Sequence, residues 1–135
     1  MDIIFDKIRE SGGRITAIKK ALLECFSENH CILSFKEISG FLEKKNFKPN
    51  RSTIYRELDL LRKFNVIEKK EISGKSFYEK KGKHHHHIVC VKCKKIEPVL
   101  MDNFLEKIEK DISREKDFLI LNHNLEFIGK CKKCN

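Results

Sequence analysis

The fold of the first half of the chain is decided by residues 49–78, which read PNRSTIYRELDLLRKFNVIEKKEISGKSFY. Pro49-Asn50 is typical of a helix start. The apolar residues that follow recur at i, i+4 and i+7, the spacing of one buried helical face: Ile54, Leu58 and Leu61. After the helix, residues 66–72 and 75–78 flank Ser73-Gly74, the pattern of a two-stranded hairpin.

Three shorter helices are expected upstream of this stretch. Residues 2–11 carry Ile4, Phe5 and Ile8 on one face and end at Ser11-Gly12-Gly13. Thr16 can cap a second helix, and Ser34 with Glu37 forms a capping box before a third. The second helix carries a stripe of Ile18, Ala21, Leu22, Cys25 and Phe26. Helices followed by a basic hairpin are typical of a winged helix-turn-helix.

The fourth helix has an exposed face that suits DNA. Hydrogen-bond donors and a flat aromatic side chain gather near its start: Arg51, Ser52, Thr53, Tyr55 and Arg56. A recognition helix places such residues against base edges and phosphates.

The charge of the chain favours a polyanionic partner. The chain has 29 Lys+Arg against 20 Asp+Glu, a net charge of +9. Residues 1–82 hold 18 basic and 12 acidic residues, so +6 of that charge lies in the first half. Double-stranded DNA is the partner this predicts, although a solvated surface would give the same count.

The chain is expected to act in the cytoplasm. Residues 1–10, MDIIFDKIRE, lack the apolar core of a signal peptide, and no apolar run reaches the roughly 20 residues of a membrane span. We therefore expect no membrane partner and reduced cysteines.

The second half is predicted to be a separate small α/β domain. The polar stretch 80–83 indicates a hinge, giving domains 1–82 and 83–135 and an α+β chain overall. Strands are expected at 88–91, 118–121 and 125–128. A helix capped by Asp102 should turn four apolar residues inward: Phe104, Leu105, Ile108 and Ile112.

Two cysteine pairs are the strongest chemical signal. Cys90 with Cys93, and Cys131 with Cys134, each place two sulfurs on one tight turn. Two such turns together supply the tetrahedral sulfur set of a closed structural Zn²⁺ site. A redox Cys-x-x-Cys is the alternative. Cys25, on an apolar stripe, is interpreted as a core thiol.

A run of four histidines, residues 84–87, precedes the first cysteine pair. In a strand, His85 and His87 would face one way and His84 and His86 the other, so one tract could serve two metal sites. Further candidate ligands are spread along the chain: His30, Glu79, Glu106 and His123.

Together these motifs resemble the ferric uptake regulator family. The resemblance rests on RSTIYRELDLL at 51–61, HHHHIVCVKC at 84–93, NHNLEFIGKCKKC at 122–134 and, more weakly, RITAIKKALLECF at 14–26. It implies a homodimeric, metal-dependent transcription regulator that binds palindromic operator DNA as a repressor of metal-uptake genes, with no enzymatic activity and no small-molecule substrate.

The resemblance also implies residue roles. The four paired cysteines correspond to the structural zinc site. Glu79, His85 and His87 correspond to the regulatory site, with His30 as a candidate first-half ligand. His84, His86, Glu106 and His123 correspond to a second metal site, and Arg14, Tyr55 and Arg56 to DNA contacts.

The sensed metal is left open by the sequence. His86 stands where iron sensors of the family typically have Asp, Ile32 stands where the first-half histidine usually falls, and peroxide sensors have Asp in place of Glu79. The histidine-rich tract favours the zinc-uptake branch. Alternatives are an Fe²⁺, Mn²⁺, Ni²⁺ or peroxide sensor and, outside the family, a zinc enzyme or a metal buffer.

Overall fold

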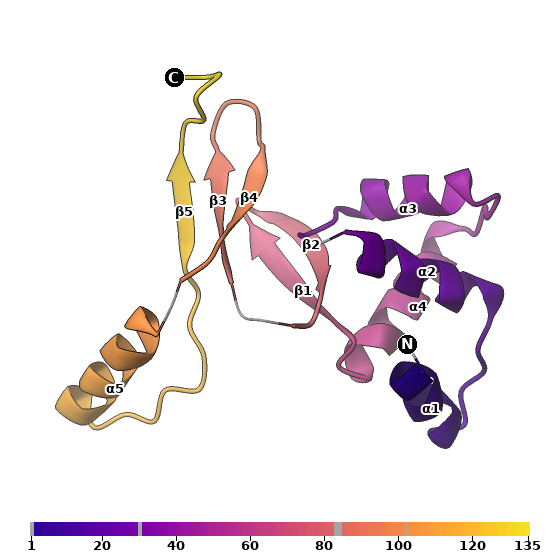
Figure 1. Cartoon of the computed structure of the whole chain (residues 1–135), viewed down its shortest axis with the longest axis horizontal. Helices are drawn as coiled ribbons and strands as arrows, with labels where there is room; N and C mark the ends of the chain where they lie inside the picture. Colours follow the sequence, from indigo (N-terminus) through magenta and orange to yellow (C-terminus); the bar gives the residue numbers. More distant parts are fainter. Residues whose placement is uncertain (1, 30, 83–84, 102) are drawn as a thin grey trace. The chain divides into compact units, whose positions relative to one another are not determined.

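The computed structural model describes residues 2–29, 31–82, 85–101 and 103–135. These residues divide into two compact units, Met1–Gly82 and Lys83–Asn135. Over the described ranges, the first unit has four helices and a hairpin, and the second has one helix and a three-stranded sheet (Figure 1). This is the α+β class predicted from the sequence, with a winged helix-turn-helix at the N-terminal end.

The second, third and fourth helices of the first unit begin where the capping residues predict. The four helices of this unit are α1 Asp2–Glu10, α2 Ala17–Glu28, α3 Phe35–Lys44 and α4 Arg51–Lys63. The Thr16 hydroxyl accepts the Lys19 N–H at 3.2 Å. Ser34 and Glu37 form the expected capping box before α3, and the Asn50 side chain accepts the Thr53 N–H at 2.9 Å before α4. Each cap satisfies a backbone donor that the helix itself leaves without a partner.

A single hydrophobic core joins these helices. The predicted stripe of α4 is buried, because Ile54, Leu58 and Leu61 are each 2% exposed or less. They pack with Leu22, Cys25 and other residues of α2 and α3. Cys25 is the core thiol that the sequence predicted, and burial raises its pKa to about 11, with Glu28 and Glu37 adding to the shift. Full burial of one such aliphatic side chain stabilises the fold by about 1.5–3 kcal/mol.

The hairpin of the first unit is formed by β1 Ile67–Ile72 and β2 Lys75–Lys80. Ser73 and Gly74 between the strands both have positive φ, 51° and 77°. A two-residue turn of this hand matches the twist of antiparallel strands. Leu33 and Tyr78 exchange backbone hydrogen bonds of 2.7 and 2.8 Å, so the residue two before α3 is attached directly to the hairpin.

The sheet of the second unit has the order β4-β3-β5. Its strands are β3 His86–Cys90, β4 Ile96–Val99 and β5 Glu126–Gly129. β3 is antiparallel to β4 and parallel to β5. The strand predicted at 88–91 is therefore present but begins earlier, and the one predicted at 125–128 is shifted by one residue. The strand predicted at 118–121 is wrong, because that segment pairs with no strand among the described residues, and three of its side chains face solvent: Phe118, Leu119 and Leu121.

The helix of the second unit, α5 Phe104–Lys116, buries none of its described residues within the chain. Phe104 is 64% exposed and Ile112 is 44% exposed, so the prediction that these side chains turn inward is wrong for the single chain. Figure 1 shows why: α5 lies beyond the end of the sheet and covers neither face. The predicted cap, Asp102, lies outside the described residues. In the described residues, no helix combines the length and apolar character needed to cross a membrane.

Candidate metal centres and DNA-reading helix

The two cysteine turns are brought together by the sheet of the second unit. β3 and β5 run parallel, with Cys90 beside Gly129 in the register. Because parallel strands end at the same edge of a sheet, the turns that follow them are neighbours. Cys90 ends β3 and Cys93 lies in the next turn, while Cys131 and Cys134 lie in the turn after β5.

The spacing of the four sulfurs fits a zinc ion. All four Sγ atoms lie within 4.8 Å of one another. The Sγ atoms of Cys93 and Cys131 are 3.7 Å apart. A tetrahedral Zn²⁺ with zinc–sulfur bonds of about 2.3 Å requires sulfurs about 3.8 Å apart. The geometry therefore suits one closed site that takes all four sulfurs as ligands.

The four cysteines also influence one another's titration. The backbone N–H of Cys131 donates to the Cys90 sulfur at 3.4 Å. This contact, followed by the N–H of Cys93, lowers the pKa of Cys90 to about 6. The Cys134 pKa is raised to about 12, mainly by its hydrogen bond to Cys131 and by burial. Hydrogen bonds within the cluster thus move the pKa of Cys90 and that of Cys134 in opposite directions.

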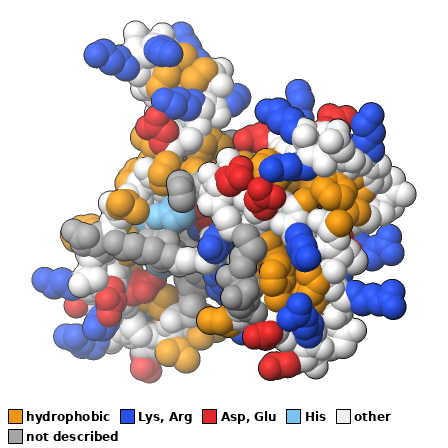
Figure 2. All heavy atoms as spheres, turned by 45° about the vertical axis from the view of Figure 1, so that its right-hand side comes forward, with side chains coloured by type: hydrophobic (Ala, Val, Ile, Leu, Met, Phe, Trp, Pro, Cys, Tyr) orange, Lys and Arg blue, Asp and Glu red, His pale blue; other side chains and the backbone are white. Residues whose placement is uncertain are grey.

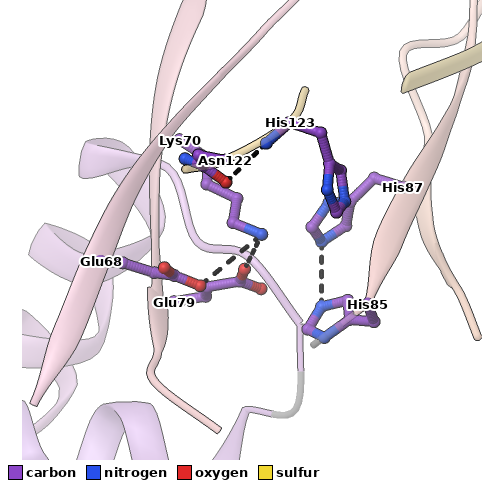
Figure 3. A network of polar contacts seen from close by, with 7 residues as sticks. All are labelled: Glu68, Lys70, Glu79, His85, His87, Asn122 and His123. Carbon is purple, nitrogen blue, oxygen red and sulfur yellow. Dashed lines mark hydrogen bonds and ion pairs between the residues drawn. The ribbon is translucent and has the colours of Figure 1, made fainter. Parts of the chain in front are cut away.

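A second group of metal ligands begins at β3. The Nε2 atoms of His85 and His87 are 3.1 Å apart, and their ring centroids are 4.7 Å apart, as Figure 3 shows. His85 directly precedes β3 and His87 is the second residue of that strand, and their two rings lie on the same side. Two imidazole nitrogens this close can bind one ion. His87 is buried and His85 is half-buried, which limits competition from water.

The intervening histidine has a different environment. The His86 ring lies 5.1 Å from the His123 ring, and the His123 Nδ1 contacts a carboxylate oxygen of Glu109. Glu106, the carboxylate named from the sequence, is exposed and pairs with Lys110 at 3.4 Å. Glu109 was missed, although it lies three residues after Glu106 and so on a neighbouring part of the helix surface.

The wing of the first unit carries the remaining carboxylate candidate. Glu79, on β2, is 2% exposed. The Lys70 Nζ atom lies 2.9 Å from the Glu79 Oε1 atom and 3.6 Å from the Glu68 Oε1 atom (Figure 3). Glu68 and Glu79 are direct partners in the register, and Lys70 follows two residues later on the same face. The lysine thus supplies a positive charge between two carboxylates.

The exposed face of α4 presents the predicted DNA contacts. Arg51, Tyr55 and Arg56 are exposed, and so is Arg14 before α2. The Ser52 hydroxyl donates to the Asn50 side chain at 2.9 Å, and Thr53 uses its backbone N–H in the same cap. The start of α4 is therefore held in one conformation while its arginines remain accessible.

An aromatic partner of this face was missed by the sequence reasoning. The ring of Phe35 stacks on that of Tyr55, with centroids 4.4 Å apart and planes 21° from parallel. The Arg51 guanidinium lies 4.6 Å from the centroid of the same Phe35 ring. The only sequence signal was an aromatic residue directly after the capping serine of α3.

The basic side chains do not mark the DNA surface by themselves. Figure 2 shows lysines and arginines at many separate points of the visible face, with acidic and apolar side chains between them. What indicates α4 as the DNA-reading helix is therefore its position in the fold and the chemistry of its side chains. Two predicted ligands, His30 and His84, lie outside the described residues.

Comparison with known proteins identifies the family. A sequence profile of the Ferric uptake regulator family matches residues 10–128. The chain is similar to the ferric uptake regulation protein of Bacillus subtilis (strain 168), with 31% identity over 141 residues that cover 100% of this chain and 94% of that protein. It is also similar to the peroxide-responsive repressor PerR of Staphylococcus epidermidis (28% identity, covering 94% and 85%).

A solved structure gives the same result for the fold. The ferric uptake regulator of Helicobacter pylori, described as having three functional metal-binding sites, superposes with a TM-score of 0.85 at 24% identity, covering 98% of this chain and 92% of that one. The chain belongs to the ferric uptake regulator family, whose members are metal-responsive transcription regulators that bind DNA. The comparisons do not single out the zinc-uptake branch.

Proposed function

We propose that this chain is a homodimeric repressor of metal-uptake genes, acting in the cytoplasm, whose binding to palindromic operator DNA requires a divalent metal ion. The observation that carries the proposal is the pair of His85 and His87 nitrogens, 3.1 Å apart at the start of β3. A second, separate cluster of four sulfurs accompanies it in the same unit. One cluster suits a permanent ion and the other an exchangeable one.

The structural ion is a Zn²⁺ held by Cys90, Cys93, Cys131 and Cys134. A four-thiolate site has no open coordination position, so its chemistry is structural. The sulfur spacing of 3.7 Å between the two turns supports this assignment. Zinc binding there would contribute folding free energy to a unit with a small core.

The regulatory ion is held by His85, His87 and Glu79, with His30 as a further ligand. Two neutral imidazoles and a buried carboxylate are a donor set for Zn²⁺, Fe²⁺, Mn²⁺ or Ni²⁺. An ion that takes ligands from both units favours one arrangement of the two DNA readers over the others. A second site of His84, His86, Glu106 and His123 is proposed in the same unit, and the Glu109 contact adds a candidate ligand to it.

The dimer would form through the second unit. Its exposed apolar side chains support this, because Phe118, Leu119 and Leu121 are 70%, 83% and 87% exposed. A monomer rarely exposes so many large apolar groups close together in the chain. Two copies would present two α4 helices to successive major grooves, which is the reason for expecting a palindromic operator.

DNA reading is assigned to α4 and its neighbours. Tyr55 and Arg56 would reach base edges, while Arg14, Arg51 and the hydroxyls of Ser52 and Thr53 would contact phosphates. The relatives named above are regulators, and we extend that role to this chain in preference to a zinc enzyme or a metal buffer. Both alternatives predict metal binding without DNA affinity.

The test is a DNA-binding titration of the zinc-loaded full chain. Duplexes are recovered from a randomised pool with Zn²⁺, Fe²⁺, Mn²⁺ or Ni²⁺ added in turn, and affinity is measured by anisotropy with and without that ion. We expect one ion to raise the affinity for DNA at least about tenfold. Zinc is the sequence-based expectation, whereas the named relatives are a ferric uptake regulation protein and a peroxide-responsive repressor. Peroxide treatment of the Fe²⁺ form tests whether the chain is a peroxide sensor.

Matched variants complete this test. Glu79→Gln and His87→Ala should bind the structural zinc but lose the metal-dependent gain in DNA affinity. Glu71→Gln, at an exposed position on the same hairpin, should retain it. A protein that binds metal but recovers no duplex with any ion would contradict the proposed function.

A further inference from the structure

Phe35 is a large aromatic residue at the start of α3. It is the first residue of α3, directly after the capping serine. The capping box fixes its backbone, since Ser34 and Glu37 each bond to the other's backbone N–H at 3.1 and 3.3 Å. The ring is half-buried against the core of the first unit. Its position is therefore set by the fold before any ligand arrives.

Two side chains of α4 use this fixed ring as a platform. Tyr55 stacks on it at 4.4 Å, and the Arg51 guanidinium lies 4.6 Å from its centroid. The Arg51 Nη2 group donates to the Tyr55 hydroxyl at 3.4 Å. We call these three residues the Phe35 stack. It joins the first turn of α3 to the first turns of α4.

The stack determines what Tyr55 can offer to a partner. Because an Arg51 N–H is directed at the hydroxyl oxygen, the hydroxyl proton is available for an outside acceptor. One face of the ring is covered by Phe35, yet 37% of the residue remains exposed. The group presented outward is thus a phenol that donates, beside a fixed positive charge. Purine N7, thymine O4 and phosphate oxygens all accept such a bond.

We propose that Phe35 is a positioning residue for DNA reading: its ring holds Tyr55 and Arg51 in the conformation in which α4 meets DNA. This inference rests on the DNA-reading role proposed for α4. Without the ring, both side chains gain rotamers in the free protein, and that freedom is lost again on binding. Aromatic stacking beyond simple burial corresponds to about a tenfold difference in affinity at most.

The first experiment compares two identical substitutions in α3. Phe35→Leu keeps apolar volume and removes the ring. Phe41→Leu is the matched control, since Phe41 is also half-buried, packs on the same core and lies under a lysine, Lys45, at 5.6 Å. The probe is the duplex recovered by the metal-loaded wild-type chain. We expect Phe35→Leu to lose about fivefold to tenfold in affinity, and Phe41→Leu less than twofold.

A double-mutant cycle separates positioning from general damage. In a Tyr55→Ala background, Phe35→Leu should cause much less further loss, because its main partner is already absent. Phe35→Tyr, which keeps the ring, should restore affinity to within about twofold of wild type. A purely structural role would give the same loss from Phe35→Leu with or without Tyr55.

The free protein offers an independent readout. The chain has no Trp and two Tyr, so in a Tyr78→Phe background Tyr55 is the only tyrosine. Its near-UV circular dichroism band should fall sharply in Phe35→Leu and persist in Phe41→Leu. An unchanged band, or equal losses of DNA affinity in the two leucine variants, would overturn the proposal while leaving DNA binding itself intact. A wild-type chain that recovers no duplex would overturn both.

Discussion

Each of the two units of this protein is stabilised internally in a different way. The first buries a continuous set of apolar side chains from three helices and a hairpin, and several of them, such as Leu22, Leu42 and Leu58, are fully buried. Among the described residues of the second unit, only four are buried, and two of these are histidines: His86, His87, Val89 and Cys90. The first unit thus has the core of an independent domain, and the second does not.

This difference explains where the metal ligands and exposed apolar groups lie. A unit of about 50 residues seldom buries enough surface to be stable alone. The sulfur cluster ties β3 to the end of β5 across 41 residues of sequence. The apolar side chains of α5 and residues 118–121 are left for a partner. We therefore expect stability, metal binding and dimerisation to be linked in the second unit. The first unit is expected to be stable without zinc and without a partner.

The largest expected effect comes from breaking the sulfur cluster. Cys134→Ser should release the structural zinc and unfold the second unit, because apparent zinc-binding free energies of about 10–16 kcal/mol accompany folding of such sites. Zinc content and calorimetric melting of the first and second units provide the measurement. Cys31→Ser, a half-buried position in the first unit, is the control and should retain zinc. A folded Cys134→Ser protein without zinc would show that the second unit folds without the ion.

A substitution in the core of the first unit should affect only that unit. Leu58→Ala removes a fully buried side chain of α4 and should lower the free energy of unfolding by about 2–5 kcal/mol, from lost burial and the cavity left behind. Zinc content and the melting of the second unit should not change. Denaturant unfolding followed by far-UV circular dichroism, with zinc assayed in parallel, measures this. Simultaneous loss of zinc would mean that the units do not fold separately.

The exposed apolar segment of the second unit should control association. Leu119→Glu places a charge at a position that is 83% exposed in the single chain and should weaken the dimer by about 2–3 kcal/mol, roughly a hundredfold in its dissociation constant. Analytical ultracentrifugation measures this. The matched control is Ile3→Glu, at 73% exposure in the first unit. If both variants remain dimeric, another surface forms the interface.

The smallest predicted effect concerns Lys70. Its ammonium group lies 2.9 Å from the Glu79 carboxylate, so a cation at the proposed regulatory site would compete with it for that carboxylate. Lys70→Met should raise the affinity for the regulatory ion about tenfold, a change of about 1.4 kcal/mol. Lys69→Met removes the same charge from the exposed, opposite face of the strand and should change affinity little. Competition with a fluorescent chelator measures both, and equal affinities would show that Lys70 does not oppose the ion.

The sequence predicted the first unit more accurately than the second. The caps at Thr16 and Ser34 and the buried stripe of α4 are local signals, and each was confirmed. They succeed because propensity, capping and burial all refer to the same short segment. The hairpin was also predicted, from a turn whose positive φ angles suit Ser73 and Gly74.

The errors in the second unit have a common cause. The strand predicted at 118–121 and the inward face of α5 were inferred from apolar pattern, which assumes that burial occurs within the chain. β4 was missed because it is a four-residue edge strand with Glu97 and Pro98, and proline is tolerated only at such edges. No local sequence pattern predicts the contact of Phe35 with Tyr55 or that of His123 with Glu109, because the fold brings each pair together from separate segments.

Hydrogen exchange of the full chain, measured before and after removal of zinc with a chelator, reports on the two units separately. We expect amides of β3 and β5 to lose their protection and those of α2 and α4 to retain theirs, because only the second unit depends on the four sulfurs and their ion. Protection that survives in β3 and β5 without zinc, or that disappears from both units together, would contradict it.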